Sequence, residues 1–244
     1  DTTLYSHPDR TKMNSGNDEI LEIVKEKGSS DSIYYPSRIL IQFKDDDIKN
    51  TISDIVGHSK FNDGTSSITL KLHSTEHKNL STPLTLKTFA VSQSWDEGTG
   101  RFSNLPTSSN GTSWIHRDNS TTKTGWTTSS FADSTSGSIN APGITEGGGT
   151  WYIGTSYGGM TYTTGSQLFT KNQTLDTDID VTSIVTHFSS SLFAGGGVIN
   201  QGFIIKQPDS VETNTSNSFG ELKYFSSDTH TIYPPKLCFK WDDS

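Results

Sequence analysis

Apolar and polar side chains alternate along several short segments of this chain. Residues 67–73 show the pattern cleanly, with Ile68, Leu70 and Leu72 separated by Thr69 and Lys71. A period of two is typical of a β-strand with one face in the core. We therefore expect strands at residues 33–44, 67–73, 83–91, 114–116, 150–153, 202–206, 221–225 and 236–241, and a strand or short helix at 20–24.

Two segments have the period of a helix instead. In residues 45–56 the apolar side chains fall at i, i+4, i+7 and i+8, on one helical face: Ile48, Ile52, Ile55 and Val56. Three aspartates open this segment and Gly57 follows it, as is usual at the two ends of a helix. In residues 178–188 a second apolar face predicts another short helix, with Asp180 at its N-terminus.

The composition supports an all-β protein with long polar loops. Of the 244 residues, 30% are hydrophobic and 10% aromatic, and serine and threonine together number about 70. Threonine and aromatic residues suit a pleated, half-exposed surface. We expect residues 33–244 to form a single domain, and residues 1–32 to form an N-terminal extension or joining segment. The chain opens at Asp1 without a methionine or a signal-peptide pattern, so we expect a processed or excised piece of a longer protein.

Charge and cysteine content exclude several classes of function. The formal net charge is −8, which argues against nucleic acid as a partner, because nucleic-acid-binding proteins present a basic face. No apolar run approaches the roughly 20 residues of a membrane-spanning helix, so we expect no insertion into a membrane. A single cysteine, Cys238, rules out an internal disulfide framework.

Six segments, taken in chain order, resemble the DNRLRE-type jelly-roll β-sandwich domains. They are residues 37–43 (SR-x-L-x-x-F), 68–72 (A-x-L-x-L), 92–98 (W-x-E, here Trp95 and Glu97), 180–185 (DVT-x-x-V), 200–205 (N-x-G-hydrophobic) and 225–237 (F-x-S-x-D/E…P-x-L). The amino-acid sequence of residues 94–102 and 226–235 is most similar to that of structural proteins of large contractile-tailed phages. Residues 103–175 do not match the pattern well.

This resemblance implies a jelly-roll-like antiparallel β-sandwich with one or two short helices. It implies a non-enzymatic structural or fibre-type component of a phage virion, acting in assembly, with attachment to the host surface as an additional role. The partners would be other virion proteins or further copies of the chain, as a homo-oligomer. The alternative is a carbohydrate-binding module of a secreted or cell-surface protein, whose partner is a glycan.

Aromatic residues in the loop-rich middle of the chain are the candidate ligand-binding groups. Flat aromatic rings stack on sugars and anchor protein interfaces. The alternative for the same residues is that they fill a core with few leucines. The candidates are Trp114, Trp126, Trp151, Tyr152, Tyr157 and Tyr162.

Asp176, Asp178 and Asp180 are the candidate metal ligands. On an extended segment the three carboxylates point to one side, and hard oxygen ligands suit a structural Ca²⁺ ion. Their spacing does not match an EF-hand loop, and the alternative is a solvated acidic edge. We expect no other cofactor.

We expect no catalytic residues. Residues 154–158 fit the pattern G-x-S-x-G around Ser156. A nucleophile elbow requires a helix directly after the serine, and residues 159–162 carry no helical pattern. The sequence therefore indicates a loop here.

Overall fold

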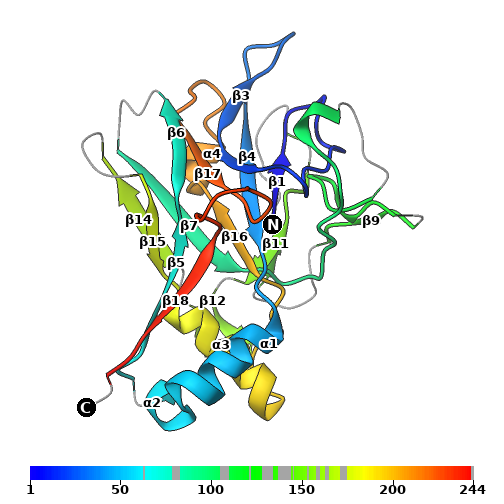
Figure 1. Ribbon diagram of the computed structural model, residues 1–244. Helices are drawn as coiled ribbons and strands as arrows, with labels where there is room; N and C mark the ends of the chain where they lie inside the picture. Colours follow the sequence, from blue (N-terminus) through cyan, green and yellow to red (C-terminus); the bar gives the residue numbers. More distant parts are fainter. Residues whose placement is uncertain are drawn as a thin grey trace.

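The fold is known from a computed structural model (Figure 1). It describes residues 1–62, 64–78, 83–104, 110–120, 122–127, 134–136, 144, 146–152, 154–157, 160–162, 165–170 and 175–242. This part of the chain is mostly β, with antiparallel strand pairs as predicted, but it has more helical segments than the one or two expected.

The largest sheet has six strands in the order β1-β4-β16-β7-β14, with β3 paired to β4. All of its pairs are antiparallel. Its strands are β1 (Thr2–Tyr5), β3 (Lys25–Lys27), β4 (Tyr34–Ile41), β7 (Leu84–Ala90), β14 (Gly165–Phe169) and β16 (Phe203–Lys206).

Two further sheets have three strands each. One has the order β15-β5-β18, from Thr177–Asp180, Ser67–Leu72 and Lys236–Lys240, and the other has the order β2-β17-β6, from Ile20–Ile23, Glu221–Phe225 and Ser74–Lys78. The other strands in the described residues form three short antiparallel pairs. They are β8 with β9 (His116–Asp118, Thr124–Gly125), β10 with β11 (Ser134–Ser136, Thr150–Tyr152) and β12 with β13 (Gly154–Tyr157, Met160–Tyr162).

The six-stranded sheet buries both of its faces. Alternate residues along a strand point to opposite faces. In β4, Ile39 and Ile41 belong to one buried apolar cluster, whereas Leu40 belongs to another. The first cluster, called the main core here, also contains side chains of β5, β7, β16 and β17, so it joins the six-stranded sheet to the three-stranded sheets. The second cluster covers the other face and includes Trp114 and Trp151.

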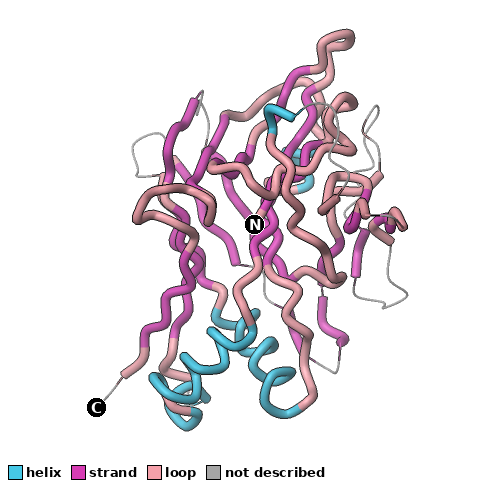
Figure 2. Tube along the Cα trace, turned by 45° about the vertical axis from the view of Figure 1, so that its right-hand side comes forward, coloured by secondary structure: helices cyan, strands magenta, loops and turns pink. Residues whose placement is uncertain are grey.

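The helical segments within residues 45–62 and 182–194 gather at one end of the molecule, below the sheets in Figures 1 and 2. The predicted helix at 45–56 is present as α1 (Asp45–Asn50), continued by a π-helix, η1 (Thr51–Val56), and it ends at Gly57, whose φ is +83°. The helix predicted at 178–188 is present as α3 (Thr182–Ala194), but residues 178–180 belong to a strand instead. The helix runs six residues beyond the predicted end, to Gly195 in the left-handed conformation. The remaining helices are α2 (His58–Asn62), the 3₁₀-helix η2 (Phe102–Asn104) and α4 (Asp209–Glu212).

Residues 1–32 do not form a separate extension. They contribute β1, β2 and β3, and each of these strands is paired with a strand from beyond residue 32. The prediction failed because most of this segment is polar and lacks alternation. Its buried side chains include Thr2, Thr3, Asn14 and Ser15, which hydrogen bonds rather than apolar contacts hold in place.

Candidate functional site

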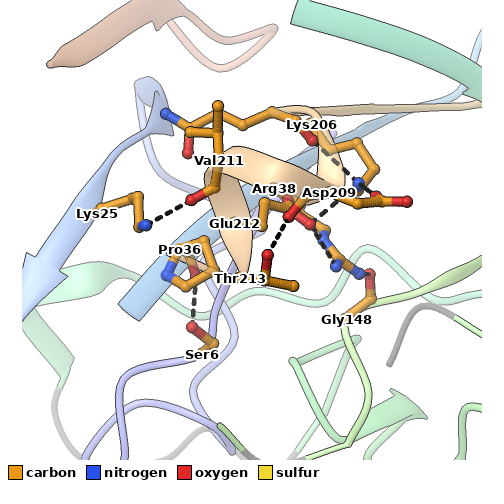
Figure 3. A network of polar contacts seen from close by, with 11 residues as sticks. Ser6, Lys25, Pro36, Arg38, Gly148, Lys206, Asp209, Val211, Glu212 and Thr213 are labelled. Atoms are coloured by element: carbon orange, nitrogen blue, oxygen red, sulfur yellow. Dashed lines mark hydrogen bonds and ion pairs between the residues drawn. The ribbon is translucent and has the colours of Figure 1, made fainter. Parts of the chain in front are cut away.

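Arg38 lies in the interior, on the face of the six-stranded sheet that carries Trp114 and Trp151. Its guanidinium donates to both carboxylate oxygens of Glu212, at 2.8 and 3.0 Å, and to the carbonyl of Gly148 at 2.7 Å. Lys206 lies 3.0 Å from the same carboxylate and also bonds Asp209. Figure 3 shows how this network ties β4 and β16 to α4.

Two indole rings enclose the charged network. The guanidinium carbon of Arg38 lies 4.8 Å from the ring centre of Trp114 and 5.0 Å from that of Trp151. Side chains of Arg38, Lys206 and Glu212 are all about 1% exposed. Because the two cations face two carboxylates and are closed off from solvent, this network is a structural element rather than a site open to a ligand.

Among the aromatic residues expected to bind a ligand, those that the structure describes do not form an exposed row. Trp114, Trp151 and Tyr152 are 0%, 5% and 9% exposed, so their rings pack in the interior and cannot offer a flat face to a sugar. Trp126 is half-buried against the second cluster, and its indole N–H donates to the carbonyl of Ser113 at 3.0 Å. The side chains of Tyr157 and Tyr162 lie outside the described part of the structure.

The three aspartates of the expected calcium site each have a separate environment. Asp176 accepts hydrogen bonds from the backbone N–H of Ser74 and from His73. Asp178 and Asp180 are exposed, and Asp180 accepts the N–H of Thr182 at the start of α3. Among the described residues these three do not form a group that could share one metal ion.

A pocket of about 420 Å³ opens beside the end of β1. Its lining combines two aromatic rings with acidic and basic side chains, a composition found in ligand sites. Tyr5 and Phe102 meet edge to face at 5.4 Å, and Arg10 stacks over the Phe102 ring at 4.1 Å. The other lining residues are Asn17, Asp18, Glu19, Ile20, Glu22, Arg101 and Ser103.

Asn14 fixes the loop that carries one wall of this pocket. Its amide donates to the carbonyls of Glu97 and Thr112, at 2.6 and 2.8 Å. Its side-chain oxygen accepts the N–H groups of Gly16 and Gly100, at 3.1 and 2.7 Å. One fully buried side chain therefore holds three chain segments together, and Phe102 follows two residues after the last of these contacts.

Burial perturbs the acidic groups of the pocket. It raises the pKa of Asp18 to about 6, against the opposing effect of the hydrogen bond from the Phe102 N–H at 2.9 Å. Burial, reinforced by the neighbouring Glu22, raises the pKa of Tyr5 well above its usual value. Glu22 accepts the Tyr5 hydroxyl at 2.8 Å and pairs with Lys223 at 2.6 Å. Such perturbed groups in a concave site are common where a ligand binds.

The alternation of apolar residues did not point to this pocket. Its polar wall comes from residues 17–22, inside the segment expected to be an extension, and from a glycine-rich loop after β7. The sequence offers only glycines close to a polar residue: Gly16 follows Asn14, and Gly98 and Gly100 follow Glu97. Such spacings do not by themselves indicate a binding site.

No family model, curated protein or solved structure matches this chain. The helices in the described part of the chain are all too short or too polar to traverse a bilayer. Any assignment of function therefore rests on the residues and the geometry given above.

Proposed function

We propose that this chain is a non-enzymatic β-sandwich domain of the jelly-roll type that serves as a structural, fibre-type component of a phage virion. Its work would be assembly, through contacts with other virion proteins or with further copies of itself. The observation that carries this proposal is the burial of Trp114 and Trp151 around Arg38. These tryptophans stabilise a scaffold, as expected of a structural domain, instead of forming an open row of sugar-binding rings.

The arrangement of the sheets supports the β-sandwich part of the proposal. Ile39 and Ile41 of β4 share the main core with Ile68, Leu70 and Leu72 of β5, which belongs to a different sheet. Inward-facing residues of two antiparallel sheets that meet in one core are the defining feature of a sandwich.

Exposed apolar side chains support a role in assembly. Ile55 and Ile199 are 62% and 63% exposed, and Phe193 of α3 is 36% exposed. Ile55 and Phe193 belong to η1 and α3, at the end of the molecule where α1, α2 and α3 lie (Figure 1). Large apolar side chains in solvent commonly mark a surface that another chain covers.

The test is quantitative mass spectrometry on purified phage particles from the source of the sequence. A fixed copy number of this polypeptide in intact particles is the expected result. Recovery of the protein only in the particle-free fraction would overturn the virion proposal.

The second candidate function is glycan binding, favoured by the pocket beside β1. Phe102 is 36% exposed and offers apolar ring surface next to Asp18, Glu22 and Arg101, which can hydrogen-bond sugar hydroxyls. The test is a glycan array, probed with the native chain and with Phe102→Ala.

Phe193→Ala is the matched control, because Phe193 and Phe102 are both 36% exposed and Phe193 lies outside the pocket. A glycan signal that Phe102→Ala removes and Phe193→Ala leaves unchanged would support glycan binding in this pocket. The absence of any glycan signal would leave assembly as the function.

A further inference from the structure

Three carboxylates from distant parts of the sequence converge beside the start of β1. Asp1 precedes β1, Glu97 lies in the loop after β7, and Asp228 lies in the loop after β17. One carboxylate oxygen from each lies within 4.8 Å of the other two. This is the one such acidic group within the described ranges of the chain.

The carboxylate of Asp1 supplies a second, independent observation. Its side chain is only 3% exposed. Asp1 Oδ2 accepts the N–H of Ser227 at 2.9 Å, but Asp1 Oδ1 is buried and has no hydrogen-bond partner. A buried carboxylate oxygen without a partner is costly, since its desolvation is not offset.

The charges at this point do not balance. Asp1, Glu97 and Asp228 each bring one negative charge to this point. A divalent cation would offset most of this charge and would supply Asp1 Oδ1 with the partner it lacks.

We propose that Asp1, Glu97 and Asp228 form a binding site for Ca²⁺. Calcium takes oxygen ligands at about 2.3–2.6 Å, so ligand atoms can lie up to about 5 Å apart across the ion, whereas the smaller Mg²⁺ limits this separation to about 4 Å. The three ligand atoms lie within 4.8 Å of one another, a separation that Ca²⁺ can span. Glu97 and Asp228 are exposed, so water can complete the coordination.

The cation would reinforce a junction at which the Asp1 carboxylate already accepts the Ser227 N–H. Asn14 binds the backbone carbonyl of Glu97, and the Ser226 N–H donates to the carbonyl of Glu19 at 3.0 Å. The ion would therefore connect the start of β1, the W-x-E loop and the loop after β17 into one unit. We infer that calcium stabilises the folded chain.

The experiment is isothermal titration of the chelator-treated native chain with CaCl₂ and, separately, with MgCl₂. The variants are Glu97→Gln and Asp228→Asn, whose exposed side chains can be exchanged without a change in the core. The matched control is Asp178→Asn, which removes an exposed carboxylate of the site that the sequence had suggested.

We expect one Ca²⁺ ion per native chain, and a Kd raised at least about tenfold in each site variant, because each loses one charged ligand. The control should bind as the native chain does. At a hundredfold excess over Kd, calcium should raise the Tm of the native chain by about 5 °C or more. It should raise the Tm of the double variant, which carries both Glu97→Gln and Asp228→Asn, by much less.

Three results would overturn the proposal. They are no calcium binding at millimolar concentration, equal binding by the native chain and the double variant, or Mg²⁺ binding as tight as that of Ca²⁺. The native-chain titration gives an answer even where a variant fails to fold. None of these results bears on the copy number in particles, so this inference and the proposed function stand or fall separately.

Discussion

Arg38 and Glu212 are 174 residues apart in the sequence, yet they form a two-point ion pair in the interior of the protein. The pair joins the centre of the six-stranded sheet to the short helix α4. Lys206 shares the same carboxylate, so one acidic group serves two buried cations. This arrangement makes Glu212 more important for stability than its single charge would indicate.

Glu212→Gln should be strongly destabilising. The substitution keeps the shape of the side chain but leaves Arg38 buried without a carboxylate and leaves Lys206 with Asp209 and the Gln207 carbonyl. Removing one partner of a buried ion pair typically costs about 3–5 kcal/mol in the free energy of unfolding. Urea unfolding followed by tryptophan fluorescence measures this loss.

Asp178→Asn is the control for this prediction. Asp178 and Lys71 form an exposed pair at 4.0 Å, and exposed pairs contribute about 1 kcal/mol or less. Equal losses in the two variants would show that the buried network is not needed for stability.

Trp114→Ala should also destabilise the fold, by about 3–5 kcal/mol, because it leaves a cavity beside Arg38. Trp126→Ala should cost clearly less, since Trp126 is only half-buried. Thermal unfolding of the two variants tests the order. If Trp126→Ala removed a glycan signal without loss of stability, Trp126 would instead be a ligand-binding ring.

The sequence was informative wherever apolar residues are periodic. The alternation of Ile68, Leu70 and Leu72 predicted β5. The helical spacing of Ile48, Ile52, Ile55 and Val56 predicted the helix that begins with α1, although Ile55 is 62% exposed in the π-helical part. In both segments burial of one face decides the structure, and the sequence alone shows which face is apolar.

The candidate site could not be predicted in the same way. Asn14 is buried because it satisfies four backbone groups from three segments, and the spacing of those segments becomes visible only in the fold. The acidic run at 176–180 suggested a metal site because alternate residues of a strand point to one side, but its members bind separate partners. The carboxylates that do converge, Asp1, Glu97 and Asp228, are far apart in the sequence.

Gly111→Ala should disrupt the loop that Asn14 holds. Gly111 has a φ of +75°, and an added Cβ would lie 2.4 Å from both the Asn14 amide nitrogen and the Gly98 Cα. The strain of the left-handed conformation alone costs about 1–2 kcal/mol, and the clash adds to it.

Gly195→Ala separates these two effects. Gly195 has a φ of +68°, and its added Cβ would meet nothing within 4 Å. We expect Gly111→Ala to lower the free energy of unfolding clearly more than Gly195→Ala does. Similar losses would indicate that backbone strain alone matters at Gly111.

Asp18 should make the stability of the protein depend on pH between about 4 and 6. Burial raises its pKa in the folded state to about 6, from an ordinary value of 3.8. Between these two values the folded chain binds more protons than the unfolded chain, so the free energy of unfolding falls as the pH rises. The stabilising contribution is fully present below the lower value and is lost above the higher one.

Asp18→Asn should remove this dependence, because asparagine carries no charge and can still accept the Phe102 N–H. We expect the variant to be more stable than the native chain at pH 7. The gain should be about 1 kcal/mol, since Asp18 is partly exposed and solvent screens its charge. The difference should shrink towards zero near pH 4, where the native carboxyl is protonated in the folded state.

Urea unfolding at pH 4, 5, 6 and 7 measures this difference, with Asp178→Asn as the exposed control. A gap between Asp18→Asn and the native chain that stays constant across this range would show that Asp18 does not titrate in the pocket as described.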